Sequence, residues 1–301
     1  MSGATSRHSL RDGLAVLQAA SRLLTVTRPV ERDWEVSAVL DRLERSGTYD
    51  PVVFEDVVGC PGWSVLGNLF ADRSNISLLL GIDPSQMNAQ IADRLAKPVL
   101  PVVVDDAPVQ AHVLTDEADL DRLPIPTLHE GDAGPYISMG VAICRDPETG
   151  QQNVGVYRFM QRGPRELVPS LTSISNAADI FRKYELAGQP MDLAVIPGGS
   201  PALALAASYK AAVDVDECAL AGGLAEEPLR LVRARTLDLL VPADAEVVIE
   251  TRVLPGARYD EAPFADMSRA YSRPKRGPLV QVTAVTHRER PVFQLAFSGH
   301  P

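Results

Sequence analysis

The sequence YISMGVAICRDPETGQQNVGVYRFMQRG, residues 136–163, contains two apolar runs separated by the turn sequence PETG at 147–150. Each run has the length of a strand and is rich in valine, isoleucine and aromatic residues, which favour strands. The proline and glycine between them are typical of a chain reversal. We therefore predict an antiparallel β-hairpin, with which a mostly β part of the chain begins.

Further strands are predicted after this hairpin. Apolar runs of strand length occupy residues 192–198, 229–242, 245–255, 277–288 and 291–299. A helix is expected among them at 201–212, where Pro201 occupies the first turn. Many mostly antiparallel strands with few helices predict a β-barrel or a β-sandwich.

The residues before the hairpin follow a mixed pattern. The predicted elements are helices at 8–24, 34–46 and 64–81 and a strand at 51–59. A proline-rich, acidic passage from Lys97 to Gly134 breaks the helical pattern and is expected to connect two regions. We predict an α+β protein with an N-terminal α+β domain at 1–119 and a β domain at 120–301.

Composition limits the classes of function. The chain has 301 residues, of which 46% are hydrophobic and 23% charged, as in folded globular proteins. Its net charge of -10 and the lack of a Lys/Arg stripe exclude nucleic acid as an expected partner. The three cysteines lack any CxxC spacing, and the sequence has neither a signal peptide nor a run that could span a bilayer. A reducing cytoplasm is expected.

Residues 152–158, QNVGVYR, form the first polar cluster of interest. Asn153 offers an amide oxygen, Gly155 permits close approach of a ligand, and Arg158 offers a bidentate fork for phosphate or carboxylate. In a regular strand Asn153 and Arg158 face opposite ways, so one shared ligand would require a kink, which we expect at Gly155. The alternative is a hairpin strand with a polar start and no ligand.

Two other segments are weaker candidates. Glu217 precedes the small residues ALAGGL, which permit either tight packing or close approach of a ligand; alternatively it is a solvated acid at a helix start. PGGSP at 197–201 lacks the GK[ST] ending of a P-loop and is interpreted as a turn. Cys144 and Cys218 stand in apolar surroundings without a paired histidine and are expected to pack in the core.

Residues 260–272, DEAPFADMSRAYS, place Glu261 and Asp266 five residues apart around a Pro-Phe step. Burial beside Phe264 would raise the pKa of a carboxyl group into the range useful for proton transfer. The alternative is a pair of ordinary loop acids.

These passages, taken in order, resemble the UbiD family of reversible decarboxylases that use prenylated FMN. The resembling sequences are LPIPTLHEGDAGPYISMGVAICRDPETGQQNVGVYR, DECALAGGL, TLDLLVPADAEVVIETRVLPGARYDEAPFADMSRAYS and VTAVTHRERPVF. The family's catalytic stretch is typically E-G-P-[FY]-G-[ED]. Here it is Glu261-Ala262-Pro263-Phe264-Ala265-Asp266, with both glycines replaced by alanine.

The resemblance implies a split β-barrel that binds the flavin and a set of site residues. Asn153 and Glu217 would bind a divalent metal, manganese or magnesium, that bridges to the flavin phosphate. The implied cofactor-binding residues are Asn153, Val156, Tyr157, Arg158, Ser175, Asn176 and Glu217. Potassium is a further implied ion, a flavin prenyltransferase would supply the cofactor, and a homo-oligomer is expected.

The implied activity is non-oxidative, reversible decarboxylation of a small aromatic or α,β-unsaturated carboxylic acid through an adduct with prenylated FMN. Asp266 would donate the proton, while Arg158 would orient the substrate carboxylate and hold Glu261 by charge pairing. The catalytic residues would thus be Asp266, Glu261 and Arg158.

Two departures from the family pattern leave alternatives open. Residues 169–181 lack the histidine that often serves as third metal ligand, so Asn176, Ser175, Gln161 or water would complete the shell. Family members also continue with a C-terminal α/β domain that is absent here. One alternative is therefore a non-catalytic or accessory subunit that needs a partner for that region. Another is a hydrolase that uses Glu261 and Asp266 as paired acid and base.

Overall fold

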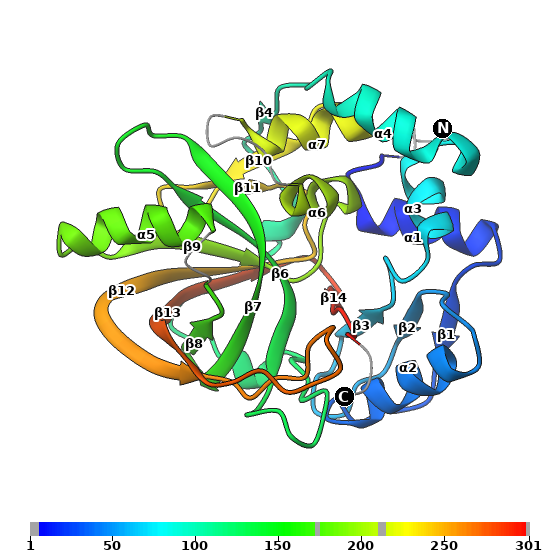
Figure 1. Cartoon of the computed structure of the whole chain (residues 1–301), viewed down its shortest axis with the longest axis horizontal. Coiled ribbons are helices and arrows are strands. Elements are labelled where there is room, and N and C mark those ends of the chain that lie inside the picture. Colours follow the sequence, from blue (N-terminus) through cyan, green and yellow to red (C-terminus); the bar gives the residue numbers. More distant parts are fainter. Residues whose placement is uncertain (1–5, 172–174, 210–214, 299–301) are drawn as a thin grey trace.

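Six strands of the predicted β region close into a barrel. The computed structural model describes residues 6–171, 175–209 and 215–298. The barrel strands are β6 (Tyr136–Arg145), β7 (Gln152–Gly163), β8 (Glu166–Pro169), β9 (Met191–Ile196), β12 (Val247–Glu261) and β13 (Lys275–His287). Their order is β12-β9-β6-β7-β8-β13, and β12 pairs with β13 to close the ring (Figure 1). The α+β class and the barrel are confirmed.

The hairpin at 136–163 is confirmed, with Arg145 opposite Gln152 and Tyr136 opposite Met160. Side chains alternate between the two faces of these strands, as the pleat requires. Ala142, Cys144 and Phe159 belong to the apolar cluster inside the barrel, whereas Val141, Ile143 and Val154 belong to a second cluster outside it. The sequence is apolar on both faces because helices cover the outer one.

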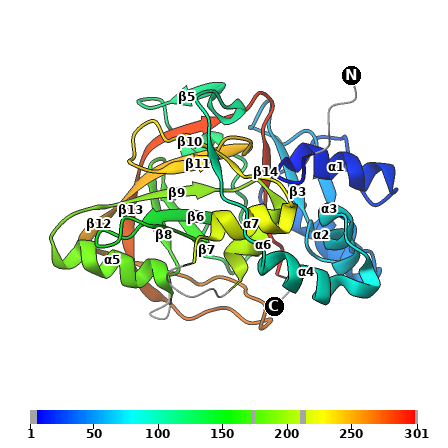
Figure 2. The same ribbon diagram turned by 90° about the horizontal axis from the view of Figure 1, so that it is seen from above.

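Helices α6 (Pro201–Ser208) and α7 (Glu217–Ala225) cover the outer face of β7. Ser200 caps α6 and Pro201 begins it, as predicted, while the predicted end at 210–212 lies outside the described residues. The glycines of ALAGGL serve packing: a Cβ at Gly222 would stand 2.2 Å from the backbone oxygen of Val99. Helix α5 (Asn176–Leu186) was not predicted. It packs against the barrel strands β12, β7, β6 and β9 (Figure 2).

The N-terminal region forms a smaller sheet with helices. Its elements are α1 (Leu10–Ala19), β1 (Leu24–Val26), α2 (Glu35–Arg45), β2 (Val52–Phe54), β3 (Ser64–Gly67), α3 (Arg73–Leu80), η1 (Pro84–Gln86) and α4 (Met87–Leu95). The sheet order is β1-β2-β3-β14, in which β14 (Val292–Gln294) returns from the end of the described chain to lie parallel to β3. In Figures 1 and 2 the barrel and helices α1 to α3 lie on opposite sides of α6.

The predicted helix at 64–81 is partly wrong. Residues 64–67 form β3 between β2 and β14, and the helix begins only at Arg73, after the cap Asp72. A Cβ at position 67 would stand 2.8 Å from the side chain of Leu40, so Gly67 lets β3 pack closely against α2. The predicted helix at 8–24 likewise ends at Ala19, and Leu24 begins β1.

The proline-rich passage contains short elements that pair with the β region. They are β4 (Val102–Val103), η2 (Pro108–Gln110), β5 (His112–Leu114) and η3 (Leu120–Arg122). Strand β4 pairs with β10 (Arg230–Arg233), which forms a hairpin with β11 (Leu240–Pro242). Strand β5 pairs with β13 in antiparallel orientation. The domain boundary near residue 120 stays a prediction. None of the helices in the described ranges is long and apolar enough to cross a bilayer.

Candidate functional site

A cavity of about 810 Å³ runs along β7, between the start of α7, the end of α6, the start of α5 and the loop after β12. We call it the main cavity. Eight of the nine predicted site residues line it: Asn153, Val156, Tyr157, Arg158, Ser175, Asn176, Glu217 and Asp266. The ninth, Glu261, lies behind the wall and contacts the cavity through Arg158. Segments far apart in the sequence are thus brought together at one place.

The open edge of β7 forms the floor of the main cavity. Strand β6 pairs with β7 from Gln152 to Met160, whereas β8 pairs only from Phe159 onward. The backbone N–H of Val154 donates to Glu217 Oε2 at 3.1 Å, and the backbone oxygen of Arg158 accepts from Ser170 at 3.0 Å. Because alternate residues of a strand point their backbone groups the same way, Val156 also directs its N–H and C=O to this edge. A ligand therefore meets backbone donors and acceptors there.

The expected kink at Gly155 is wrong. The register between β6 and β7 is unbroken from Asn153 to Tyr157. The register shift between these two strands lies at Ile137–Gly140 of β6. Asn153 and Arg158 share one cavity because it runs along the strand edge and receives side chains from both faces. Gly155 has another role: a Cβ there would stand 2.7 Å from the Tyr157 hydroxyl, so the glycine makes room for that ring.

Glu217 is the first residue of α7 and is only 4% exposed. Burial raises the pKa of its carboxyl group, although the hydrogen bond from Val154 opposes the shift. The interpretation as a solvated acid is therefore wrong. The carboxylate is instead buried in the wall of the main cavity.

Arg158 and Glu261 form a bidentate ion pair at the opposite end of the main cavity. Nε and Nη2 of Arg158 donate to the two carboxylate oxygens at 2.8 and 3.1 Å, and Nη2 also donates to Ser272 Oγ at 3.1 Å. The guanidinium carbon lies 4.8 Å from the centre of the Phe264 ring. Glu261 is fully buried, so the pair fixes the guanidinium plane in a water-poor setting.

Asp266 is half-buried on the wall of the main cavity. The hydroxyl and the backbone N–H of Ser268 both donate to its Oδ1 and lower the pKa of the carboxyl group, and the nearby charge of Arg158 adds to this. The expectation that burial raises this pKa is wrong, because two hydrogen bonds to the ionised form outweigh a small desolvation.

Residues 261–266, the acid-bearing segment, are held by residues 128–133, which we call the clamp loop. The Asp132 side chain is fully buried and accepts from the backbone N–H groups of Ala265 at 2.8 Å and His129 at 3.0 Å. Ala133 N–H donates to Pro263 O at 2.8 Å. Sequence reasoning missed Asp132, because it lies in the passage interpreted as a connection and only its distant partners reveal its role.

The donor set at Asn153 and Glu217 fits a hard divalent cation. Magnesium keeps several waters and is commonly bound by one or two carboxylates together with phosphate oxygens, so one carboxylate and one amide oxygen suffice beside a phosphate. Ser175 and Asn176 line the same cavity, whereas the Gln161 amide donates to Asp121 Oδ1 at 2.6 Å and lies outside it. Within the described ranges no three His, Cys, Asp or Glu side chains cluster as a metal site.

Comparison with known proteins identifies the family. Residues 102–301 match the family model of the 3-octaprenyl-4-hydroxybenzoate carboxy-lyase Rift-related domain, and residues 14–95 match that of the N-terminal domain of the same enzyme. The uncharacterised protein sll0936 of Synechocystis sp. is 30% identical over 97% of this chain, which spans 63% of that protein.

Solved structures agree. The UbiD-class enzyme HmfF of Pelotomaculum thermopropionicum in complex with FMN is 37% identical with a TM-score of 0.91, over 96% of this chain and 64% of that one. An evolved dimeric form of HmfF with prFMN has the same identity and TM-score over 67% of its length. Vanillic acid decarboxylase of Sedimentibacter hydroxybenzoicus, in closed form, is 28% identical with a TM-score of 0.93, over 98% of this chain and 65% of that one. The chain, which spans about two thirds of these relatives, belongs to the UbiD family of carboxy-lyases.

Proposed function

We propose that the protein catalyses the non-oxidative, reversible decarboxylation of an aromatic or α,β-unsaturated carboxylic acid with prenylated FMN. The observation that carries the proposal is the convergence of eight predicted site residues on the main cavity, with the ninth paired to Arg158. The binding of FMN or prFMN by HmfF and the decarboxylation of vanillic acid by another relative support it.

The cofactor would occupy the part of the main cavity along β7. Prenylated FMN, when bound, supplies the electron-accepting ring system that the cleavage of a carbon–carbon bond requires. The open edge at Val156 would bind its polar atoms, since the N–H of Val154 already donates to Glu217, and Tyr157 would pack beside it. Asn153 and Glu217 would hold manganese or magnesium against the flavin phosphate. Potassium stays a prediction from the family resemblance.

The substrate carboxylate would meet Arg158. Within the described residues Nη1 has no hydrogen-bond partner, while Nε and Nη2 are held by Glu261. Glu261 therefore aims the free edge of the guanidinium group into the cavity, and Phe264 packs against its plane. The fixed guanidinium group would hold the substrate carboxylate in place and so orient the carbon–carbon bond that is broken.

Asp266 would handle the proton. Decarboxylation replaces the carboxylate on carbon by a hydrogen, so each turnover consumes one proton, and carboxylation releases one. In the described arrangement hydrogen bonds from Ser268 favour the ionised form of Asp266. Asp266 must therefore take up a proton before it delivers one to the substrate carbon, and we propose that its contact with Ser268 breaks at that step.

The test is to produce the protein together with a flavin prenyltransferase and to measure bound flavin by absorbance and mass spectrometry. Exchange of labelled bicarbonate into candidate aromatic acids then reports turnover. Arg158→Lys should lower kcat by about a hundredfold, since lysine cannot keep the two-point contact with Glu261. Arg162→Lys on the same strand is the control, because Arg162 pairs with Glu166 away from the main cavity.

The same experiment separates the alternatives. A folded protein without any bound flavin would overturn the proposal and favour the accessory subunit. Exchange that is equally fast in Arg158→Lys would remove Arg158 from the mechanism. The paired acid and base of a hydrolase is disfavoured already, because both oxygens of Glu261 are engaged by Arg158. Homo-oligomer formation is a further proposal, which light scattering of the purified protein tests.

A further inference from the structure

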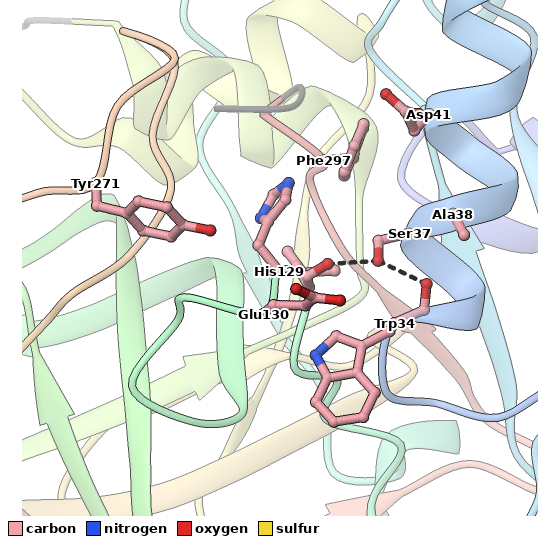
Figure 3. A pocket seen from close by; sticks show the side chains of 9 residues that line it. Trp34, Ser37, Ala38, Asp41, His129, Glu130, Tyr271 and Phe297 are labelled. Carbon is pink, nitrogen blue, oxygen red and sulfur yellow. Dashed lines mark hydrogen bonds between the residues drawn. The ribbon is translucent and has the colours of Figure 1, made fainter.

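A second cavity of about 320 Å³ lies between helix α2, the clamp loop, Tyr271 and Phe297 (Figure 3). The extended residues 296–298 separate the two: Ala296 and Ser298 line the main cavity, whereas Phe297 lines the second. The opposite wall is helix α2, and the clamp loop forms the floor. Ser37 Oγ lies within hydrogen-bond distance of both Leu128 O and Trp34 O, which share its single hydroxyl hydrogen, and this contact joins α2 to the clamp loop at the floor (Figure 3).

Aromatic side chains gather around the second cavity. Trp34 is 55% exposed and Tyr271 is 42% exposed, which is high for residues of this size, and both line the cavity together with Phe297. Trp34 is fixed at the start of α2 in the left-handed region at φ +64°, where its N–H donates to Thr127 O at 2.9 Å. The uncommon backbone conformation of a bulky residue turns the indole to the cavity rather than to the core.

The charges around the second cavity are negative. The carboxylates of Asp41 and Glu130 line it, and none of the described lining residues is a lysine or an arginine. Asp41 pairs at 2.7 Å with Arg45, which is 63% exposed and so screened by water. The whole chain carries a charge of -10. The negative charges around the cavity therefore favour the binding of a cationic ligand over an anionic one.

We propose that the second cavity binds an organic cation, an ammonium or guanidinium group, against the Trp34 indole beside Glu130 (Figure 3). Aromatic faces attract cations through the ring quadrupole, and Asp41 and Glu130 would supply the balancing charge. The group belongs either to a free amine or to a lysine or arginine side chain of another polypeptide. Tyr271 accepts a hydrogen bond from Gly131 of the clamp loop at 3.1 Å, which fixes the phenol on the other side of the cavity (Figure 3).

The experiment titrates the flavin-free protein with choline, with its neutral tert-butyl isostere, and with lysine whose backbone charges are blocked. Calorimetry gives Kd, and tryptophan fluorescence reports the site, because Trp34 is exposed while the other tryptophan, Trp63, is buried. Choline should bind and its isostere should not. Trp34→Leu should weaken binding about tenfold. Asp41→Asn and Glu130→Gln should each weaken it about threefold.

Glu55→Gln, which removes an exposed carboxylate at the end of β2, is the matched control and should leave Kd unchanged. Stronger binding of choline than of blocked lysine assigns the site to a small free ammonium compound, and the reverse assigns it to a side chain of a partner. Equal binding of the neutral isostere, or no binding of either cation to the folded protein, would overturn the proposal. Since no flavin is present, these outcomes are independent of decarboxylase activity.

Discussion

Ala262 carries a backbone conformation that alanine rarely adopts. Its φ of +103° lies in the region that glycine tolerates, and its side chain is buried in the acid-bearing segment. Such strain costs about 1–3 kcal/mol, against about 0.5–1 kcal/mol for the extra chain entropy of glycine. Ala262→Gly should therefore raise the free energy of unfolding by about 1 kcal/mol, measured by urea denaturation.

Ala265 provides the matched control for this prediction. It is buried in the same segment, but its φ is not positive, so glycine there brings no relief of strain. Ala265→Gly should lower the free energy of unfolding by about 1 kcal/mol. If both variants lost stability to the same degree, the idea of strain at Ala262 would be wrong.

Ser268 controls the ionisation of Asp266 through two hydrogen bonds, one from its hydroxyl. Ser268→Ala removes that donor, so the pKa of Asp266 should rise towards its ordinary value, as measured by NMR titration of the carboxyl carbon. A lowered pKa in the folded state stabilises the protein above the unfolded pKa, and this stability is lost as pH falls through the folded pKa. The variant should thus lose less stability on acidification.

Ser85→Ala is the comparison for the titration, because Ser85 donates to Asp83 with its hydroxyl and backbone in the same way, far from the main cavity. It should raise the pKa of Asp83 and leave that of Asp266 unchanged. An Asp266 pKa that did not move in Ser268→Ala would show that the Ser268 hydroxyl does not lower it.

Strand β7 is the element on which the site depends, because its edge faces the main cavity where β8 does not pair with it. Gly155→Ala would place a Cβ 2.7 Å from the Tyr157 hydroxyl and force that ring into the cavity. Overpacking of this kind costs about 1–3 kcal/mol, and flavin occupancy, measured by absorbance per protein, should fall about tenfold.

Gly163→Ala lies on the same strand, where a Cβ would come no closer than 3.9 Å to Glu166 Oε2. It should keep the flavin occupancy of the unaltered protein. Equal occupancy in both variants would mean that Tyr157 is not part of the cofactor site.

Elements whose partners are nearby in sequence were the predictable ones. The hairpin at 136–163 and helix α2 follow from local patterns, and both are confirmed. Residues 64–67 were mistaken for helix because their strand pairs with β14, far away in the chain. Asp132 and the open edge of β7 escaped prediction for the same reason, since a buried carboxylate and an unpaired edge are defined only by distant neighbours.

At the scale of the whole molecule, the family resemblance predicted more of the site than any single pattern. Spacing alone made Asn153 and Arg158 doubtful partners, because they face opposite sides of one strand. The four motifs, taken together in the family's order, pointed to nine residues, and eight of these line the main cavity. The second cavity could not be predicted, because its walls come from α2, the clamp loop, Tyr271 and Phe297, and no motif joins them.

The pairing of β14 with β3 also orders events in time. Ser64 and Val292 are neighbours in the sheet, yet all six barrel strands lie between them in sequence. During synthesis the N-terminal helices leave the ribosome first, but their sheet exposes an unpaired edge at β3 until β14 has followed the barrel. Such long-range closure is slow and leaves an intermediate prone to association. The sheet whose first strands are made before the barrel is therefore completed only after it.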